Sequence, residues 1–136
     1  MQRDNLYSTQ TEKNIQQFIG DFETIAKKSG FIIHNADTME MANTFGLHGV
    51  VVSPDFDLHM VQICKPEKAA KSLAANPERA VLMPKYIMLF TKDGKTQIRF
   101  LRYGSDAICA IIDDPVFPAS LAETYERIVA IIDEAR

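Results

Sequence analysis

The sequence predicts an α+β fold in which helices pack on one face of a mostly antiparallel β-sheet. Three patterns support this prediction: a hairpin turn between two alternating stretches, an amphipathic helical stripe near the start of the chain, and a second such stripe at its end. No internal repeat or linker composition interrupts the chain. We therefore expect residues 1–136 to form a single domain, with residues 1–9 as a lead-in.

The stripe near the start of the chain predicts a helix over residues 10–29. Its apolar residues recur at three- and four-residue steps from residue 15 to residue 26. Thr9 and Glu12 have the spacing of a capping box, which would satisfy backbone N–H groups at the start of this helix. Gly30 suits the position just after the end of the helix.

The stripe at the end of the chain predicts a helix over residues 119–135, with Ser120 and Glu123 as a second capping box. Ser105 suits the start of a shorter helix over residues 106–112. Apolar residues of both helices are expected in the core: Ile108, Cys109, Ile111 and Ile112 on the shorter helix, and Leu121, Tyr125, Ile128, Ile131 and Ile132 on the longer one.

The clearest hairpin signal is Asp93-Gly94, a dipeptide typical of a type I′ turn, between strands over residues 85–92 and 95–103. A two-residue turn fixes which residues face each other across the two strands. The predicted register places Leu89 opposite Ile98 and Ile87 opposite Phe100 on one face, and Phe90 opposite Gln97, Met88 opposite Arg99 and Tyr86 opposite Leu101 on the other.

Residues 56–66 carry the most informative local pattern, a strand that runs into a lone cysteine, Cys64. Lys65 precedes a proline and is biased away from helical angles, so it suits an N-cap with Pro66 at the first helical position. This helix is expected over residues 66–76, with a small-residue face that can approach a sheet closely. Shorter elements are expected to be a strand over residues 31–35, a brief helix from Asp37 or Thr38 to Phe45, and a connection or minor strand over residues 49–54.

Side chains in the strand before Cys64 alternate between the two faces of the sheet. We expect Phe56, Leu58 and Met60 to meet the helices, together with one face of the hairpin. The opposite face then remains apolar, and large exposed apolar patches usually mark partner or ligand surfaces. The sequence therefore predicts a homo-oligomer, a dimer, formed through this second face, or a face that closes over a small ligand. Its expected apolar residues are Val61, Ile63, Tyr86, Met88, Phe90 and Leu101.

The composition is that of an ordinary soluble globular protein, with 46% hydrophobic and 24% charged residues. The formal charge of -3, without a basic stripe, argues against a nucleic-acid partner. No apolar run approaches the ~20 residues needed to span a bilayer, and the first residues lack the apolar segment of a secretory signal. We therefore expect a cytoplasmic location, no membrane partner and reduced cysteines.

Cys64 has both a functional and a structural interpretation. It could be a thiolate or a ligand-contacting group, favoured by the free backbone N–H groups at the start of the next helix. The more ordinary interpretation is a small core residue, because free cysteine is among the most buried residue types. His59 leaves the opposite face of a regular strand, so a catalytic Cys64–His59 pair is not expected.

Charged residues near Cys64 extend the candidate ligand site. Lys65 and Lys85 flank the helix that follows the cysteine and could add positive charge there. Arg99 lies on the second face, where it could bind an anionic ligand, pair across a dimer interface or simply extend to solvent. The chain shows no metal-ligand spacing, phosphate loop or hydrolase motif, so neither a metal nor a cofactor is expected. The expected ligand-binding residues are Cys64, Lys65, Pro66, Lys85 and Arg99.

Several segments resemble a bacterial and archaeal family, domain of unknown function family 302. They are residues 63–70 with their Cys-Lys-Pro turn, residues 76–77, residues 81–84 before the hairpin, the strand entry at residues 28–31, and the short helix within residues 37–46. The resemblance covers about residues 10–135. It implies an α+β sandwich that often self-associates, and it implies no activity.

Two positions depart from the usual pattern of that family. Lys65 stands where asparagine is usual, and Lys85 follows the proline where members often carry a second cysteine. The missing cysteine weakens a dithiol or cysteine-metal interpretation for this chain.

Together these observations favour a self-associating small-ligand-binding or sensory module, with a pocket near Cys64, Pro66 and residues 83–85. One alternative is a thiol-dependent enzyme or redox protein in which Cys64 is the reactive residue. Another is a purely structural interaction module. The sequence assigns no catalytic residue unless Cys64 is reactive.

Overall fold

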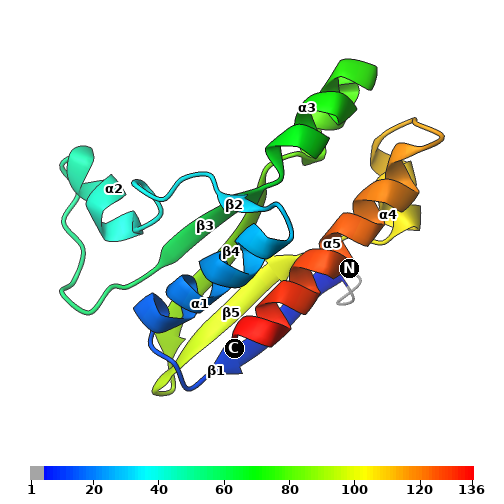
Figure 1. Ribbon diagram of the computed structural model, residues 1–136. Helices are drawn as coiled ribbons and strands as arrows, with labels where there is room; N and C mark the ends of the chain where they lie inside the picture. Colours follow the sequence, from blue (N-terminus) through cyan, green and yellow to red (C-terminus); the bar gives the residue numbers. More distant parts are fainter. Residues whose placement is uncertain (1–4) are drawn as a thin grey trace.

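The computed structural model describes residues 5–136 and shows an open antiparallel sheet with helices packed on one face (Figure 1). The α+β prediction is therefore confirmed. The sheet contains five strands in the order β1-β5-β4-β3-β2. Their bounds are Leu6–Thr11 for β1, Ile32–Ile33 for β2, His59–Cys64 for β3, Lys85–Lys92 for β4 and Lys95–Leu101 for β5.

The helices include two long ones, α1 and α5, that lie side by side across the sheet (Figure 1). The helix α3 extends away from the end of the sheet, and α2 lies at the opposite end (Figure 1). The bounds are Ile15–Lys28 for α1, Met41–Leu47 for α2, Pro66–Ala75 for α3, Pro77–Leu82 for the 3-10 helix η2, Ser105–Ile111 for α4 and Phe117–Ala135 for α5.

The hydrophobic core lies between the sheet and the pair α1 and α5. The sheet contributes β-branched and aromatic side chains, and the helices contribute residues at three- and four-residue spacing. Burying one such side chain fully is worth about 1.5–3 kcal/mol, so this layer supplies most of the driving force for folding. Its most deeply buried members include Phe18, Phe22, Ile63, Ile87, Leu89, Ile98, Phe100, Ile128 and Ile132.

The predicted hairpin is confirmed. Asp93 and Gly94 both have positive φ angles, of 56° and 74°, as a type I′ turn requires. The observed pairs Ile87–Phe100, Met88–Arg99, Leu89–Ile98 and Phe90–Gln97 match the predicted register.

The face assignment of β3 is wrong in the prediction. Val61 and Ile63, expected on the second face, are each 1% exposed and lie in the core, while Met60 is half-buried. Phe56 and Leu58 precede β3, which begins at His59. Both alternating sets in this segment are apolar, so alternation alone does not choose between them. A shift of one residue moves every side chain to the other face.

The start of the chain also differs from the prediction. Residues 6–11 form the edge strand β1, where a lead-in and the start of a helix were expected, and α1 begins only at Ile15. The Asn14 side chain accepts a hydrogen bond from the Gln17 backbone, and the Gln17 side chain accepts one from the Asn14 backbone. This capping box replaces the predicted one because residues 6–11 pair with β5. Residues 1–4 lie outside the described part of the chain.

Three other helix predictions need correction. Ser120 and Glu123 lie inside α5, which starts at Phe117, so they do not form its cap. The short helix α4 starts at Ser105 with Gly104 as its N-cap, and it leaves both Cys109 and Ile111 exposed, although both were expected in the core. The expected small-residue face of α3 does not pack into the core, since none of its residues is buried.

Two other helix predictions are confirmed. Lys65 is the N-cap of α3 with Pro66 at its first turn, and α5 buries its expected core residues.

The sheet face opposite α1 and α5 carries a mixed apolar surface, which we call the open face. Its side chains come from alternate positions of the strands, including Met60 on β3, Met88 and Phe90 on β4, and Leu6 and Leu101 on the edge pair. Leu6 and Leu101 are 42% and 53% exposed, whereas Met60, Met88 and Phe90 are half-buried by their neighbours. Over residues 5–136, no helix is long and apolar enough to cross a membrane.

Candidate functional site

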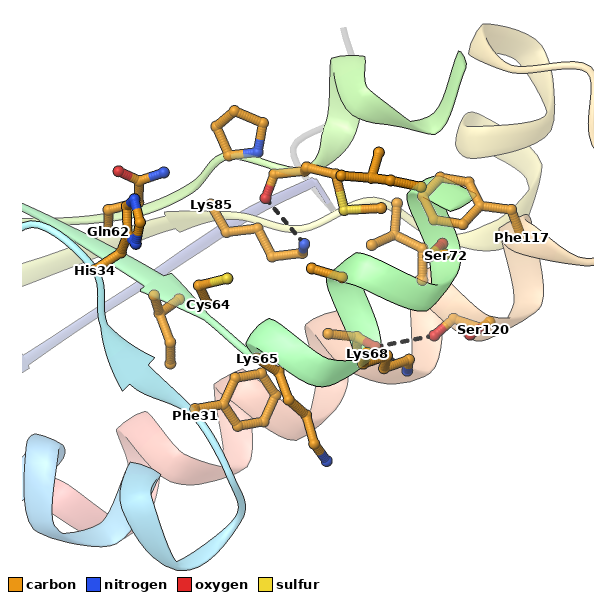
Figure 2. Close-up of a pocket in the computed structure, with 17 residues that line it drawn as sticks. Phe31, His34, Gln62, Cys64, Lys65, Lys68, Ser72, Lys85, Phe117 and Ser120 are labelled. Atoms are coloured by element: carbon orange, nitrogen blue, oxygen red, sulfur yellow. Dashed lines mark hydrogen bonds between the residues drawn. The ribbon is translucent and has the colours of Figure 1, made fainter. Parts of the chain in front are cut away.

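A cavity of about 210 Å³ opens between α3 and α5, at the end of the sheet where β3 stops and β4 starts (Figure 2). Its volume far exceeds the ~10–15 Å³ that one water molecule requires. The walls are largely apolar and combine segments that are distant in sequence: Phe31 and His34 beside β2, Gln62, Ile63 and Cys64 of β3, Lys65, Lys68, Ala69, Ser72 and Leu73 at α3, Met83, Pro84 and Lys85 at the corner before β4, and Phe117, Ser120, Leu121 and Thr124 of α5.

Local sequence explains why α3 starts beside this cavity. Lys65 is extended, with φ −113° and ψ 90°, because the following proline disfavours helical angles. Pro66 then opens the helix in the turn where its missing N–H costs nothing. At the other end of α3, Asn76 stops the helix and caps η2 by accepting a hydrogen bond from the Glu78 backbone. The chain then turns at Met83-Pro84 and enters β4.

Lys85 extends into the cavity from the first position of β4 (Figure 2). Its Nζ donates a hydrogen bond to the Met83 carbonyl oxygen at 3.2 Å and lies 5.9 Å from the centre of the Tyr125 ring. Burial lowers the pKa of Lys85 to about 8, the nearby Cys64 raises this pKa and the Lys68 charge lowers it further. Within the described residues, no carboxylate lies within 4.0 Å of this amine.

Two more lysines line the same cavity from α3 and its cap. Lys68 Nζ donates to Thr124 Oγ1 at 2.6 Å, which links α3 to α5. Partial burial lowers the pKa of Lys68, an effect partly offset by Glu123. Lys65 Nζ lies 5.4 Å from the centre of the Phe31 ring, a cation–π contact.

The cavity lining is positively charged, since it contains Lys65, Lys68 and Lys85 but neither aspartate nor glutamate among the described residues. Cys64 is half-buried, and its side chain points into the same space as Lys85 (Figure 2). His34 and Gln62 lie together at one end of the cavity. Such a lining can receive a small molecule with an apolar body and an anionic group.

The structure places the predicted ligand-binding residues at three different locations. Cys64, Lys65 and Lys85 line the cavity, whereas Pro66 starts α3 without lining it. Arg99 lies on the open face, where its guanidinium donates to the Thr9 and Ile98 carbonyls at 3.0 Å each and to Gln97 Oε1 at 3.1 Å. The guanidinium carbon also lies 5.4 Å from the centre of the Phe90 ring. Three of the guanidinium hydrogen bonds are therefore already made within the chain.

The sequence reasoning missed the contribution of α5 and of Lys68. Phe117, Leu121 and Thr124 belong to a helix far away in sequence, and no local pattern indicates that this helix meets α3. Lys68 lies in the first turn of the helix predicted after Cys64, close in sequence to the candidate residues Lys65 and Pro66. This closeness in sequence is the signal that could have indicated Lys68.

A buried ion pair joins η2 to the start of α5, close to the cavity. Asp114 accepts hydrogen bonds from Arg79 Nε at 2.7 Å, from Arg79 Nη2 at 3.1 Å and from Asn76 Nδ2 at 2.9 Å. Its Oδ1 also accepts from the backbone N–H groups of Val116 and Phe117, at 2.9 and 2.8 Å. These bonds, led by those from Arg79, hold the pKa of Asp114 well below its usual range. Asp114 therefore connects η2 to the start of α5.

The comparisons with known proteins assign a family to this fold. The family model described as domain of unknown function DUF302 matches residues 7–135. The chain belongs to the DUF302 family. This confirms the resemblance found in the sequence. A similar structure is that of an uncharacterized conserved DUF302 protein from Bacillus stearothermophilus, with a TM-score of 0.79, 19% identity, and coverage of 97% of this chain and 98% of that chain.

At 19% identity the second DUF302 structure supports the fold and nothing further. No curated protein matches the chain. The family description names no ligand or reaction. The geometry of the cavity is therefore the basis for proposing its function.

Proposed function

We propose that this DUF302 protein binds a small amphipathic anion in the cavity between α3 and α5. The observation that carries the proposal is an apolar cavity whose charged lining residues, within the described chain, are all lysines. An amine that is withdrawn from water and has no counter-ion destabilises the protein. A ligand carboxylate or similar group would remove that cost, while the apolar body of the ligand would pack against Phe117, Leu121 and Met83.

A matched pair of ligands tests the proposal. Hexanoate and 1-hexanol share an apolar chain of the same length and differ in charge. Because a hydrogen bond to a charged group contributes ~1.5–3 kcal/mol, we expect hexanoate to bind about 10-fold to 100-fold more tightly in NMR titrations. Lys85→Met should abolish most of this preference. Lys92→Met, which changes an exposed lysine on the same strand, should leave it unchanged.

Equal affinity of the wild-type protein for hexanoate and 1-hexanol would contradict the proposal. So would a preference for hexanoate that survives in the Lys85→Met variant. Native mass spectrometry of the purified protein provides an independent test, because a retained small molecule would be released on denaturation.

A second candidate function is a thiol-dependent enzyme or redox protein, which is favoured by the position of Cys64 beside Lys85 in the same cavity. A nearby cation stabilises a thiolate. Cys109 is exposed and provides an internal standard. If Cys64 is a reactive residue, iodoacetamide should modify it faster in a Cys109→Ser variant than it modifies Cys109 in a Cys64→Ser variant. Slower modification of Cys64, slowed further by hexanoate, would instead support the ligand-binding function.

We also propose that the protein self-associates as a dimer through the open face, with a second copy of the chain as the partner. The open face carries the apolar residues Met60, Met88, Phe90 and Leu101, and Met88 is paired with Arg99. Because intrachain carbonyl and amide oxygens already accept from its guanidinium, two such faces could meet without leaving these three hydrogen bonds unmade. A purely structural module would show this association without any ligand preference in the cavity.

A further inference from the structure

We propose that Lys85 forms a reversible imine with a small apolar 2-oxo acid bound in the cavity. This inference rests on the proposed ligand-binding function and names the ligand class. Lys85 Nζ lies in an apolar cavity and bonds to the Met83 carbonyl oxygen, and no carboxylate of the described residues holds it as an ion pair.

An amine in such surroundings can act as a nucleophile, because desolvation and a neighbouring cation both favour its neutral form. The groups that face Lys85 are Cys64 from β3, Lys68 from α3 and Tyr125 from α5. With its pKa lowered to about 8, a substantial fraction of Lys85 is neutral just above neutral pH. An exposed lysine, with an ordinary pKa of ~10.4, has far less neutral amine at that pH.

The position of Lys68 indicates which carbonyl compound fits. Lys68 and Lys85 line the same cavity, whose lining among the described residues includes no acidic side chain. The Lys68 charge also lowers the pKa of Lys85. A carboxylate next to the reacting carbonyl would accept a hydrogen bond from Lys68 and supply the negative charge that the lining lacks. A 2-oxo acid has this arrangement. Its apolar side chain would lie against Phe117 and Leu121 of α5.

The reaction is a condensation that releases one water molecule. The Nζ lone pair attacks the carbonyl carbon, and the electrons of the C=O π bond move to the oxygen. The protons that leave Nζ end on this oxygen, the C–O bond then breaks, and the oxygen departs as water while the C=N bond forms. No oxidant or reductant takes part, and hydrolysis reverses the step.

Trapping with a reductant tests the inference. The protein is incubated with 4-methyl-2-oxopentanoate and sodium cyanoborohydride at pH 8, digested, and analysed by tandem mass spectrometry. We expect one lysine to gain the mass of the acid less one oxygen atom, and that lysine to be Lys85, labelled at least 10-fold faster than exposed Lys92. Lys85→Arg should keep the preference for hexanoate over 1-hexanol, because the charge remains, but should lose the specific label.

The outcomes separate the two proposals. Hexanoate preference together with label spread evenly over exposed lysines, unchanged in Lys85→Arg, overturns the imine and leaves the anion-binding function standing. Loss of the hexanoate preference itself overturns the function on which the inference rests. Specific labelling of Lys85 that saturates with the concentration of the oxo acid supports both.

Discussion

At the residue scale, Lys85 contributes to the cavity a charged group that can lose its proton. Its side chain lies in a largely apolar cavity that Cys64 and Lys68 also line, and its amine is 5.9 Å from the centre of the Tyr125 ring. An arginine would remain charged at every relevant pH, whereas a lysine can lose its proton when it is buried. A lysine at this corner therefore offers acid–base chemistry that an arginine would not.

The free energy of unfolding of the unliganded protein should depend on pH, because this amine is buried. Burial lowers the pKa of Lys85 from 10.5 to about 8 in the folded state, so the unfolded state binds more protons between these values. The free energy of unfolding should then rise as pH increases from about 8 toward 10.5, because the destabilising charge disappears from the folded protein. We expect Lys85→Met to have a higher Tm than wild type at pH 7. This difference in Tm should become smaller as pH rises from about 8 toward 10.5.

Thermal melts of both proteins at several pH values between 7 and 10 measure this difference. Lys92→Met is the matched control, because its side chain is exposed at the far end of the same strand. A difference in Tm between wild type and Lys85→Met that does not change with pH would show that Lys85 acts through packing and not through its charge.

Asp114 belongs to the element scale, because its bonds join η2 to the start of α5. The carboxylate satisfies two backbone N–H groups at a helix N-terminus, a position where negative charge is favourable, and pairs with Arg79, which also lies 5.1 Å from the Phe117 ring centre. Removing one partner of a buried ion pair is strongly destabilising, since the other charge is left without compensation.

We expect Asp114→Asn to lower Tm by several degrees at pH 7 and to increase hydrogen exchange in η2 before other elements. The difference from wild type should vanish as pH falls through the depressed pKa of Asp114, because protonation then removes the same charge. Asp113→Asn, at the exposed neighbouring position, is the control. Equal exchange of η2 in both variants would contradict the role assigned to Asp114.

Sequence patterns predicted elements well where one local signal dominates. The Asp93-Gly94 turn fixed the hairpin register, and the Lys65-Pro66 step fixed the start of α3. The same reasoning failed for β3, where two alternating apolar sets compete, and for β1, whose polar sequence gains its strand geometry from pairing with β5. The cavity could be predicted only in part, because α5 meets α3 through a contact that no local pattern encodes.

At the scale of the whole molecule, the long helices α1 and α5 lie on the other side of the sheet and leave the open face uncovered (Figure 1). Among the described residues, Val81 and Leu82 of η2 border this face and line a hollow with Met88 and Leu101. A sheet that buries only one face usually presents polar side chains on the other. Here Met88 and Phe90 occupy the central strand of that face, with Met60 and Leu101 beside them. This departure from the usual pattern is the basis for the proposed dimer.

Met88→Lys should shift the protein from dimer to monomer at tens of micromolar, because a charge at the centre of an apolar interface loses its water without gaining a partner. Sedimentation equilibrium measures the change, and circular dichroism checks that the fold is kept. Val51→Lys serves as the control, since Val51 is 94% exposed outside the sheet. A wild-type protein that sediments as a monomer at these concentrations would disprove the proposed interface.

The helix α3 has one more consequence for how the cavity would fill. It forms one wall of the cavity but buries none of its own residues, so it gains little from the core that stabilises α1 and α5. Segments of this kind open locally at low free-energy cost. An entering molecule would supply the apolar neighbour that α3 lacks, so ordering of the helix and capture of the molecule would occur together. The association rate would then be set by fluctuations of α3 and would fall below the rate of diffusional encounter.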